Sequence, residues 1–119
     1  MPVAAAGNTN ASDGNVAMRP ATDPHVISVS AVDSSNLVAG FATRNDKVDI
    51  TAPGVNVFGP TVSESSAGAA GGVSYGWSGE LSGTSYSTPM VAAAAAMVKQ
   101  ARPGLDASQV GRLLVESAT

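Results

Sequence analysis

The chain has no cysteine among its 119 residues. Disulfides, a thiol nucleophile and thiolate metal sites are therefore excluded, although the cellular compartment stays open. Basic runs are also missing, and the formal net charge of −3 makes nucleic acid and anionic membranes unsuitable partners. The longest apolar run, "MVAAAAAMV", is far shorter than the roughly 20 residues that span a bilayer. We therefore expect neither nucleic-acid nor membrane binding.

Aromatic side chains make up only 4% of the chain, although 44% of it is hydrophobic. Much of the apolar content is alanine and valine, so the core must be built from small side chains in closely packed layers of helix and sheet. The length is within the usual range of one domain. The start, "MPVAAAGN", lacks the basic region and the long apolar stretch of a secretory signal, so we expect no signal peptide there.

Three short apolar segments indicate buried strands. They cover residues 2–7, 26–32 and 48–54, and each is bounded by turn-forming Gly, Pro, Asn or Asp. Residues 59–80 are rich in Gly, Ser and Ala and show little periodicity. We expect a long surface loop or an insertion at that place.

Two helices are expected after these strands. The first lies within residues 85–104, where Pro89 is near the start, alanines fill the middle, and a Pro-Gly pair stops the helix. The second opens with a capping box, with Asp106 as N-cap and Gln109 three residues later. Strands followed by helices favour an α/β layered domain over a sandwich or a bundle. Few helices lie between the first strands, so we expect either unusual connections or a sheet with elements missing.

Ser85 lies between a glycine turn at Gly83 and the start of the first helix. Its ordinary role would be that of an N-cap. The same position suits a nucleophile, because backbone N–H groups at a helix start can bind an anion and the helix dipole favours negative charge there. The spacing "GTSYS" lacks the second glycine of G-x-S-x-G, which disfavours the α/β-hydrolase elbow. Asn8, after "AAAG", could donate one hydrogen bond to an oxyanion while the Ser85 N–H donates another.

In chain order, "PVAAAGN", "DPHVISVSAVDSSNLVAGFATRNDKVDITAPG" and "LSGTSYSTPMVAAAAAMVKQARPGLDASQVGRLL" resemble the C-terminal half of subtilisin-like serine proteases. The resemblance covers residues 1–119 apart from the Gly/Ser-rich stretch. It implies an α/β fold, a three-layer subtilisin-like parallel sheet with flanking helices, of which only the C-terminal part is present. The implied activity is that of a serine endopeptidase, which hydrolyses peptide bonds in a polypeptide substrate through an acyl-enzyme.

The same resemblance assigns roles to individual residues. Ser85 matches the family's nucleophile, and Asn8 matches the side-chain donor of its oxyanion hole. Thr84 is expected to support the oxyanion from the position next to the nucleophile. Small residues that match one wall of the primary specificity pocket would leave room for a large substrate side chain; they are Ala5, Ala6 and Gly7.

In this family the acid and the base precede the nucleophile in the order Asp, His, Ser. Both also precede the oxyanion asparagine, so we expect them upstream of Met1. His25, the single histidine, follows Asn8 and is expected to be exposed or to cap a turn. Lys99 lies roughly 21 Å along the helix from Ser85. The chain alone should be close to inactive, because a serine hydroxyl without a base is a poor nucleophile.

The alanine-rich helix has no polar face before Lys99, and a helix that is apolar all round is normally enclosed. We therefore expect an exposed apolar face where the missing N-terminal half of the domain belongs, and this half is an expected partner. We expect no cofactor and assign no metal ligands, because the acidic residues show no spacing of an oxygen cage. The resemblance allows a weak calcium site by analogy, and it implies a secreted parent protein. The alternative is a catalytically inert fragment or pseudo-enzyme that acts as a protein-binding module.

Overall fold

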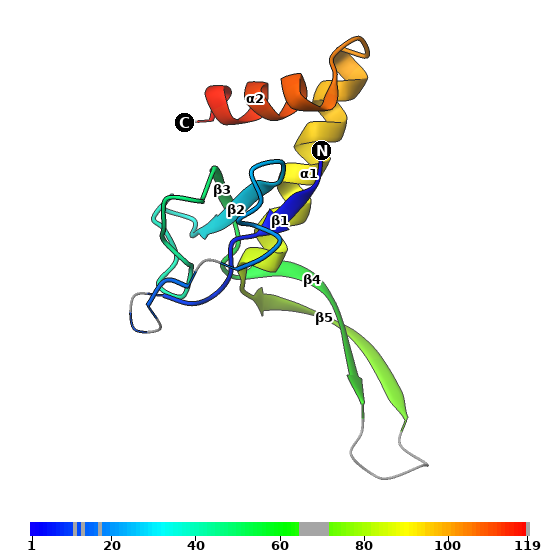
Figure 1. Ribbon diagram of the computed structural model, residues 1–119. Helices are drawn as coiled ribbons and strands as arrows, with labels where there is room; N and C mark the ends of the chain where they lie inside the picture. The colour runs from blue at the N-terminus through cyan, green and yellow to red at the C-terminus, as the bar shows by residue number, and fades with distance from the viewer. Residues whose placement is uncertain (11, 13, 17, 65–71, 119) are drawn as a thin grey trace.

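The computed structural model describes residues 1–10, 12, 14–16, 18–64 and 72–118 (Figure 1). Its elements follow in the order β1 (Val3–Ala5), β2 (Ile27–Val32), β3 (Ile50–Pro53), β4 (Val57–Glu64), β5 (Val73–Leu81), α1 (Thr84–Ala101) and α2 (Ala107–Ser117). The three strands and two helices expected from the sequence are confirmed. The α/β class is confirmed as well, since a parallel sheet is combined with packed helices.

The parallel sheet has the strand order β1-β2-β3, with Val3 opposite Ile27 and Val29 opposite Ile50. All six residues of β2 are buried, as expected for the middle strand of a parallel sheet. Helix α1 packs against all three strands, and α2 packs against α1. One buried cluster joins these elements: Ile27, Val29, Ala52, Val91, Val110 and Leu114.

The prediction of a loop is wrong at residues 59–64 and 73–80, where the structure has strands. β4 and β5 form an antiparallel hairpin that extends away from the parallel sheet (Figure 1). Residues 65–71, which join the two strands in sequence, lie outside the described residues. In β5 glycines and serines alternate with apolar residues. The composition is therefore that of a loop, although the two-residue alternation is that of a strand.

The pairing of the hairpin gives it two different faces. Pro60 lies opposite Trp77 and Val62 opposite Tyr75, so these four side chains share one face. The ring of Phe58 stacks on Trp77, with 5.5 Å between ring centroids. The other face is small and polar, and the Ser63 and Ser74 hydroxyls meet across it at 2.7 Å. One face of the hairpin is therefore aromatic and exposed.

Two glycines allow the start of α1 to lie against the end of β3. The Gly83 N–H donates to the Gly54 carbonyl at 2.8 Å, and the Ser87 hydroxyl donates to the Ala52 carbonyl at 2.9 Å. A Cβ atom at Gly54 would overlap the Ser87 Oγ and lie 2.9 Å from the Gly83 carbonyl oxygen. Any side chain at residue 54 would push the helix away from the sheet.

The capping box predicted for α2 is confirmed. The Asp106 carboxylate accepts from the Gln109 N–H at 2.8 Å, and the Gln109 side chain accepts from the Asp106 N–H at 2.8 Å. Lys99, near the end of α1, donates to the Pro103 carbonyl at 2.7 Å. These polar contacts fix the turn between the two helices.

One side of α1 is apolar and open to solvent. Its buried residues are Thr84, Ser87 and Val91, whereas Met97 is 69% exposed. Met90 is also exposed, together with the alanines at positions 92, 93 and 96. The exposed apolar face that the sequence predicts is present. Within the described residues, no helix is both long enough and apolar enough to cross a membrane.

We predict that Gly54→Ala destabilises the protein, because the added methyl group meets backbone as well as the Ser87 hydroxyl. Overpacking of this kind lowers the free energy of unfolding by about 1–3 kcal/mol. Gly40→Ala is the matched control, since nothing lies within 4 Å of the added Cβ. Urea denaturation measures both variants, and equal stabilities would contradict the proposed packing.

A second prediction concerns the open face of α1. The monomeric chain should bind a dye that reports exposed apolar surface, and Met97→Gln should reduce its fluorescence. Met18→Gln, at a methionine that is 48% exposed in a loop, is the control and should change the signal less. A monomer that binds no dye would refute the exposed face.

Candidate active site

Asn8 lies just after β1 and is held by the start of α1. Its Oδ1 accepts from the Thr84 N–H at 3.1 Å and from the Thr84 hydroxyl at 3.0 Å. These bonds join segments that are 76 residues apart in sequence. Because Oδ1 is occupied by Thr84, the Nδ2 group of the Asn8 amide is the part left to act as a donor.

Thr84 is a buried residue that holds Asn8 in place. The residue is 1% exposed, and its hydroxyl also accepts from the Gly7 N–H at 3.3 Å. The single hydroxyl proton is used in the bond to Asn8. The Thr84 side chain is therefore bonded to the Asn8 amide, and direct support of an oxyanion by Thr84 stays a prediction.

Ser85 is not the N-cap of α1, so the ordinary interpretation of this serine is wrong. The N-cap is Gly83, which makes no side-chain capping bond, and the helix begins at Thr84. The Ser85 side chain is exposed. In the part of the chain that the structure describes, its backbone N–H has no acceptor, as expected for the first turn of a helix.

Gly83 keeps the space between the two donors open. Its backbone angles, φ 154° and ψ 155°, lie in a region that is essentially restricted to glycine. A Cβ atom built on it would lie 3.4 Å from the Asn8 Nδ2 and 3.8 Å from the Ser85 nitrogen. Both N–H donors therefore border one small region next to the exposed Ser85 hydroxyl. Two donors at the positive end of a helix can stabilise an oxyanion.

Ala5, Ala6 and Gly7 continue from β1 toward this region. The Ala6 N–H donates to the Val29 carbonyl at 2.8 Å, and the Gly7 carbonyl accepts from the Thr43 N–H at 3.0 Å. Ala6 is 3% exposed, so both its methyl group and its backbone are largely covered. A role in a specificity pocket stays a prediction for these three residues.

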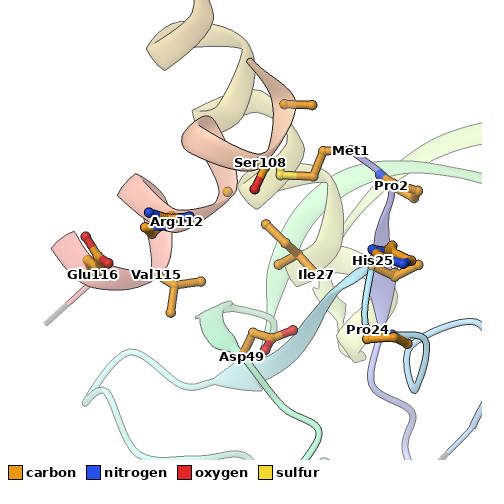
Figure 2. Close-up of a pocket in the computed structure, with 13 residues that line it drawn as sticks. Met1, Pro2, Pro24, His25, Ile27, Asp49, Ser108, Arg112, Val115 and Glu116 are labelled. Atoms are coloured by element: carbon orange, nitrogen blue, oxygen red, sulfur yellow. The ribbon is translucent and has the colours of Figure 1, made fainter. Parts of the chain in front are cut away.

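His25 lies at the opposite end of the parallel sheet from Asn8. It precedes β2, whose first residue pairs with the first residue of β1, whereas Asn8 follows the end of β1. It lines a cleft of about 590 Å³, together with Pro2 and Pro24, between the start of the sheet and α2 (Figure 2). The side chain is exposed, as the sequence predicts. His25 therefore does not reach Ser85.

The lysines Lys99 and Lys47 are both bonded away from Ser85. Lys99 is bonded at the far end of α1. Lys47 precedes β3, at the same end of the sheet as His25, and its Nζ lies 3.0 Å from the Asp46 carboxylate. The hydrogen bond and the positive charge of Lys47 hold the pKa of Asp46 below its ordinary value. Neither lysine therefore lies beside the nucleophile candidate.

Two aspartates in the described loops bond the backbone. Asp49 accepts from the Ser28 N–H at 2.8 Å, and Asp33 accepts from the Ser35 and Leu37 N–H groups at 2.8 and 3.0 Å. Among the residues that the structure describes, no three His, Asp or Glu side chains gather closely enough to hold a metal ion. The weak calcium site remains an expectation from the resemblance.

Comparison with known proteins covers the whole chain. The model of the Subtilase family matches residues 1–119. The chain is 37% identical over 118 residues to Subtilisin DY of Bacillus licheniformis, covering 98% of this chain and 39% of that protein. It is 38% identical over 117 residues to a thermostable alkaline protease of Halalkalibacterium halodurans, covering 98% of this chain and 28% of the relative.

Solved structures show the same similarity. A cold-adapted subtilisin-like serine proteinase matches with a TM-score of 0.67 and 30% identity, over 94% of this chain and 36% of that one. A protease from Pseudoalteromonas arctica matches with a TM-score of 0.76 and 25% identity, over 97% of this chain and 34% of that one. The chain thus spans less than half the length of these proteins. From its sequence and its fold, it belongs to the subtilase family.

Proposed function

We propose that this chain carries the nucleophile and the oxyanion hole of a serine endopeptidase. The observation that supports this most strongly is the bonding of the Asn8 amide oxygen to Thr84, which leaves the Asn8 Nδ2 and the Ser85 N–H around the space at Gly83. The membership of the subtilase family supports the same reaction class.

In the proposed reaction, the Ser85 Oγ attacks the scissile peptide carbonyl and gives its proton to a histidine base. The carbonyl oxygen becomes negative and accepts hydrogen bonds from the Asn8 Nδ2 and the Ser85 N–H. Collapse expels the amine, which takes the proton from the histidine, and leaves an acyl-enzyme on Ser85. Water, losing a proton to the same histidine, then hydrolyses the acyl-enzyme, and that proton returns to the Ser85 Oγ. Removing one such donor costs about 10²–10³ in kcat, a value that was itself obtained with a subtilisin.

The proposal assigns the aspartate and the histidine to the remainder of the domain. In subtilases both precede the nucleophile in the chain, and the relatives have most of their length outside the matched part. The same remainder would cover the apolar face of α1, where Met97 is exposed. The 119 residues alone would then be nearly inactive, and secretion of the parent protein belongs to the same proposal.

The alternative is a protein-binding module without catalysis. One observation favours it: the hairpin presents Phe58, Tyr75 and Trp77 to solvent, each at least 69% exposed. Large exposed aromatic side chains on one face are typical of interaction surfaces. This surface is also compatible with an enzyme, so reactivity at Ser85 separates the two functions.

The test is covalent labelling of the purified chain by a fluorophosphonate, alone and mixed with the N-terminal part of a subtilase that supplies the aspartate and the histidine. We expect little labelling of the chain alone, because Ser85 has no base. The mixture should be labelled, Ser85→Ala should abolish the signal, and Asn8→Ala should slow it by about 10².

His25→Ala is the matched control and should leave the labelling of the mixture unchanged. Labelling that survives Ser85→Ala would contradict the assignment of the nucleophile. If the chain alone is labelled and His25→Ala abolishes this labelling, His25 is the base. That result would overturn the proposal that the histidine lies in the remainder of the domain.

A further inference from the structure

Thr43 is a fully buried threonine next to the turn that carries Asn8. It is 0% exposed. Its backbone N–H donates to the Gly7 carbonyl at 3.0 Å. Its hydroxyl accepts from the Thr9 N–H at 3.1 Å and donates to the Thr9 carbonyl at 3.0 Å. A single residue therefore bonds the backbone on both sides of Asn8.

The fit between Thr43 and this turn depends on Gly7. Gly7 has φ +111°, and a Cβ atom there would lie 3.1 Å from the Thr43 Oγ1. Its missing side chain lets the threonine hydroxyl approach the turn. On its other side, the Thr43 carbonyl accepts from the Ser30 hydroxyl at 3.2 Å. The turn is thereby tied to β2, the middle strand of the sheet.

Asn8 itself is exposed, so its position depends on what holds its neighbours. Thr43 fixes the backbone before and after it, and Thr84 fixes the amide oxygen. The Thr84 bonds alone could be kept while the backbone shifted, which would move Nδ2 away from the space beside Gly83. Donors of an oxyanion hole act only when they are held in place before the reaction.

We propose that Thr43 is a positioning residue for the oxyanion donor Asn8. The contribution of Thr43 to catalysis rests on the proposed function. The effect of Thr43 on the position of the Asn8 amide does not. The buried hydroxyl restrains the Gly7–Thr9 backbone, and through it the direction of the Asn8 Nδ2 donor.

The test uses NMR of the ¹⁵N-labelled chain and follows the two Nδ2 protons of Asn8, identified by their loss in Asn8→Asp. Thr43→Val keeps the shape of the side chain and removes the hydroxyl. It should change the chemical shifts of this proton pair, because the backbone on both sides of Asn8 loses its bonds to the threonine hydroxyl. Thr43→Ser keeps the hydroxyl and should restore the signals of the parent chain.

Leu114→Ala is the control for general destabilisation, because Leu114 is a buried residue of α2 in the main core cluster. It should lower the melting temperature and leave the Asn8 amide signals in place. A folded Thr43→Val chain with unchanged Asn8 signals would overturn the proposal, as would equal changes in Leu114→Ala.

If Thr43→Val does not fold, Thr9→Val serves as the second variant. It removes only the Thr9 hydroxyl, which lies 2.9 Å from the Thr43 Oγ1, and it should shift the same amide pair to a smaller extent. Unchanged signals in that variant would also overturn the proposal. Because NMR requires no turnover, failure here is distinct from failure of the Ser85 labelling, which concerns the proposed function.

Discussion

The amide oxygen of Asn8 caps helix α1 from a turn that lies 76 residues earlier in the chain. The helix has no side-chain cap of its own, because glycine occupies the N-cap position. Asn8 therefore satisfies the first free N–H of the helix, and the same bond turns its NH₂ group toward the Ser85 side. One interaction joins β1 to α1, completes the helix start and orients a donor.

The two glycines at the helix start make this interaction possible. Gly54 lets α1 rest on the end of β3, and Gly83 leaves space between the two N–H donors. The site thus forms where the carboxyl ends of β1 and β3 meet the amino end of a helix. Ligand sites of parallel α/β sheets commonly lie at this edge. His25 and Lys47 lie at the opposite end of the sheet, beside the amino ends of the strands, so neither is placed to act as a base for Ser85.

Local sequence signals predicted the parts of the fold that depend on local physics. The sequence predicts the apolar run of β2, the alanine-rich α1 and the capping box of Asp106 and Gln109, because each is encoded in adjacent residues. The hairpin was missed, although "VSYGWSGEL" alternates, because its glycines and serines resemble a loop. In β5 these small residues lie on the face opposite the exposed aromatic one.

The candidate site was predictable only in part. The resemblance paired Asn8 with Ser85, and the structure brings the two segments together. The bonds of Thr84 to Asn8 and of Thr43 to Thr9 could not be predicted, because both are buried hydroxyls whose partners lie far away in sequence. No local pattern distinguishes a threonine that bonds a distant turn from one that simply fills the core.

The most direct measurement is a double-mutant cycle on the free energy of unfolding, with Asn8→Ala, Thr84→Val and the double variant. Thr84→Val removes the hydroxyl that donates to the Asn8 amide oxygen and keeps the Thr84 N–H bond. If this hydroxyl holds the Asn8 amide, the effects of the single variants are not additive, and the coupling between the two side chains is about 1 kcal/mol or more. Effects that add within about 0.3 kcal/mol would show that the two residues act independently, and would contradict the account of how this site is held together.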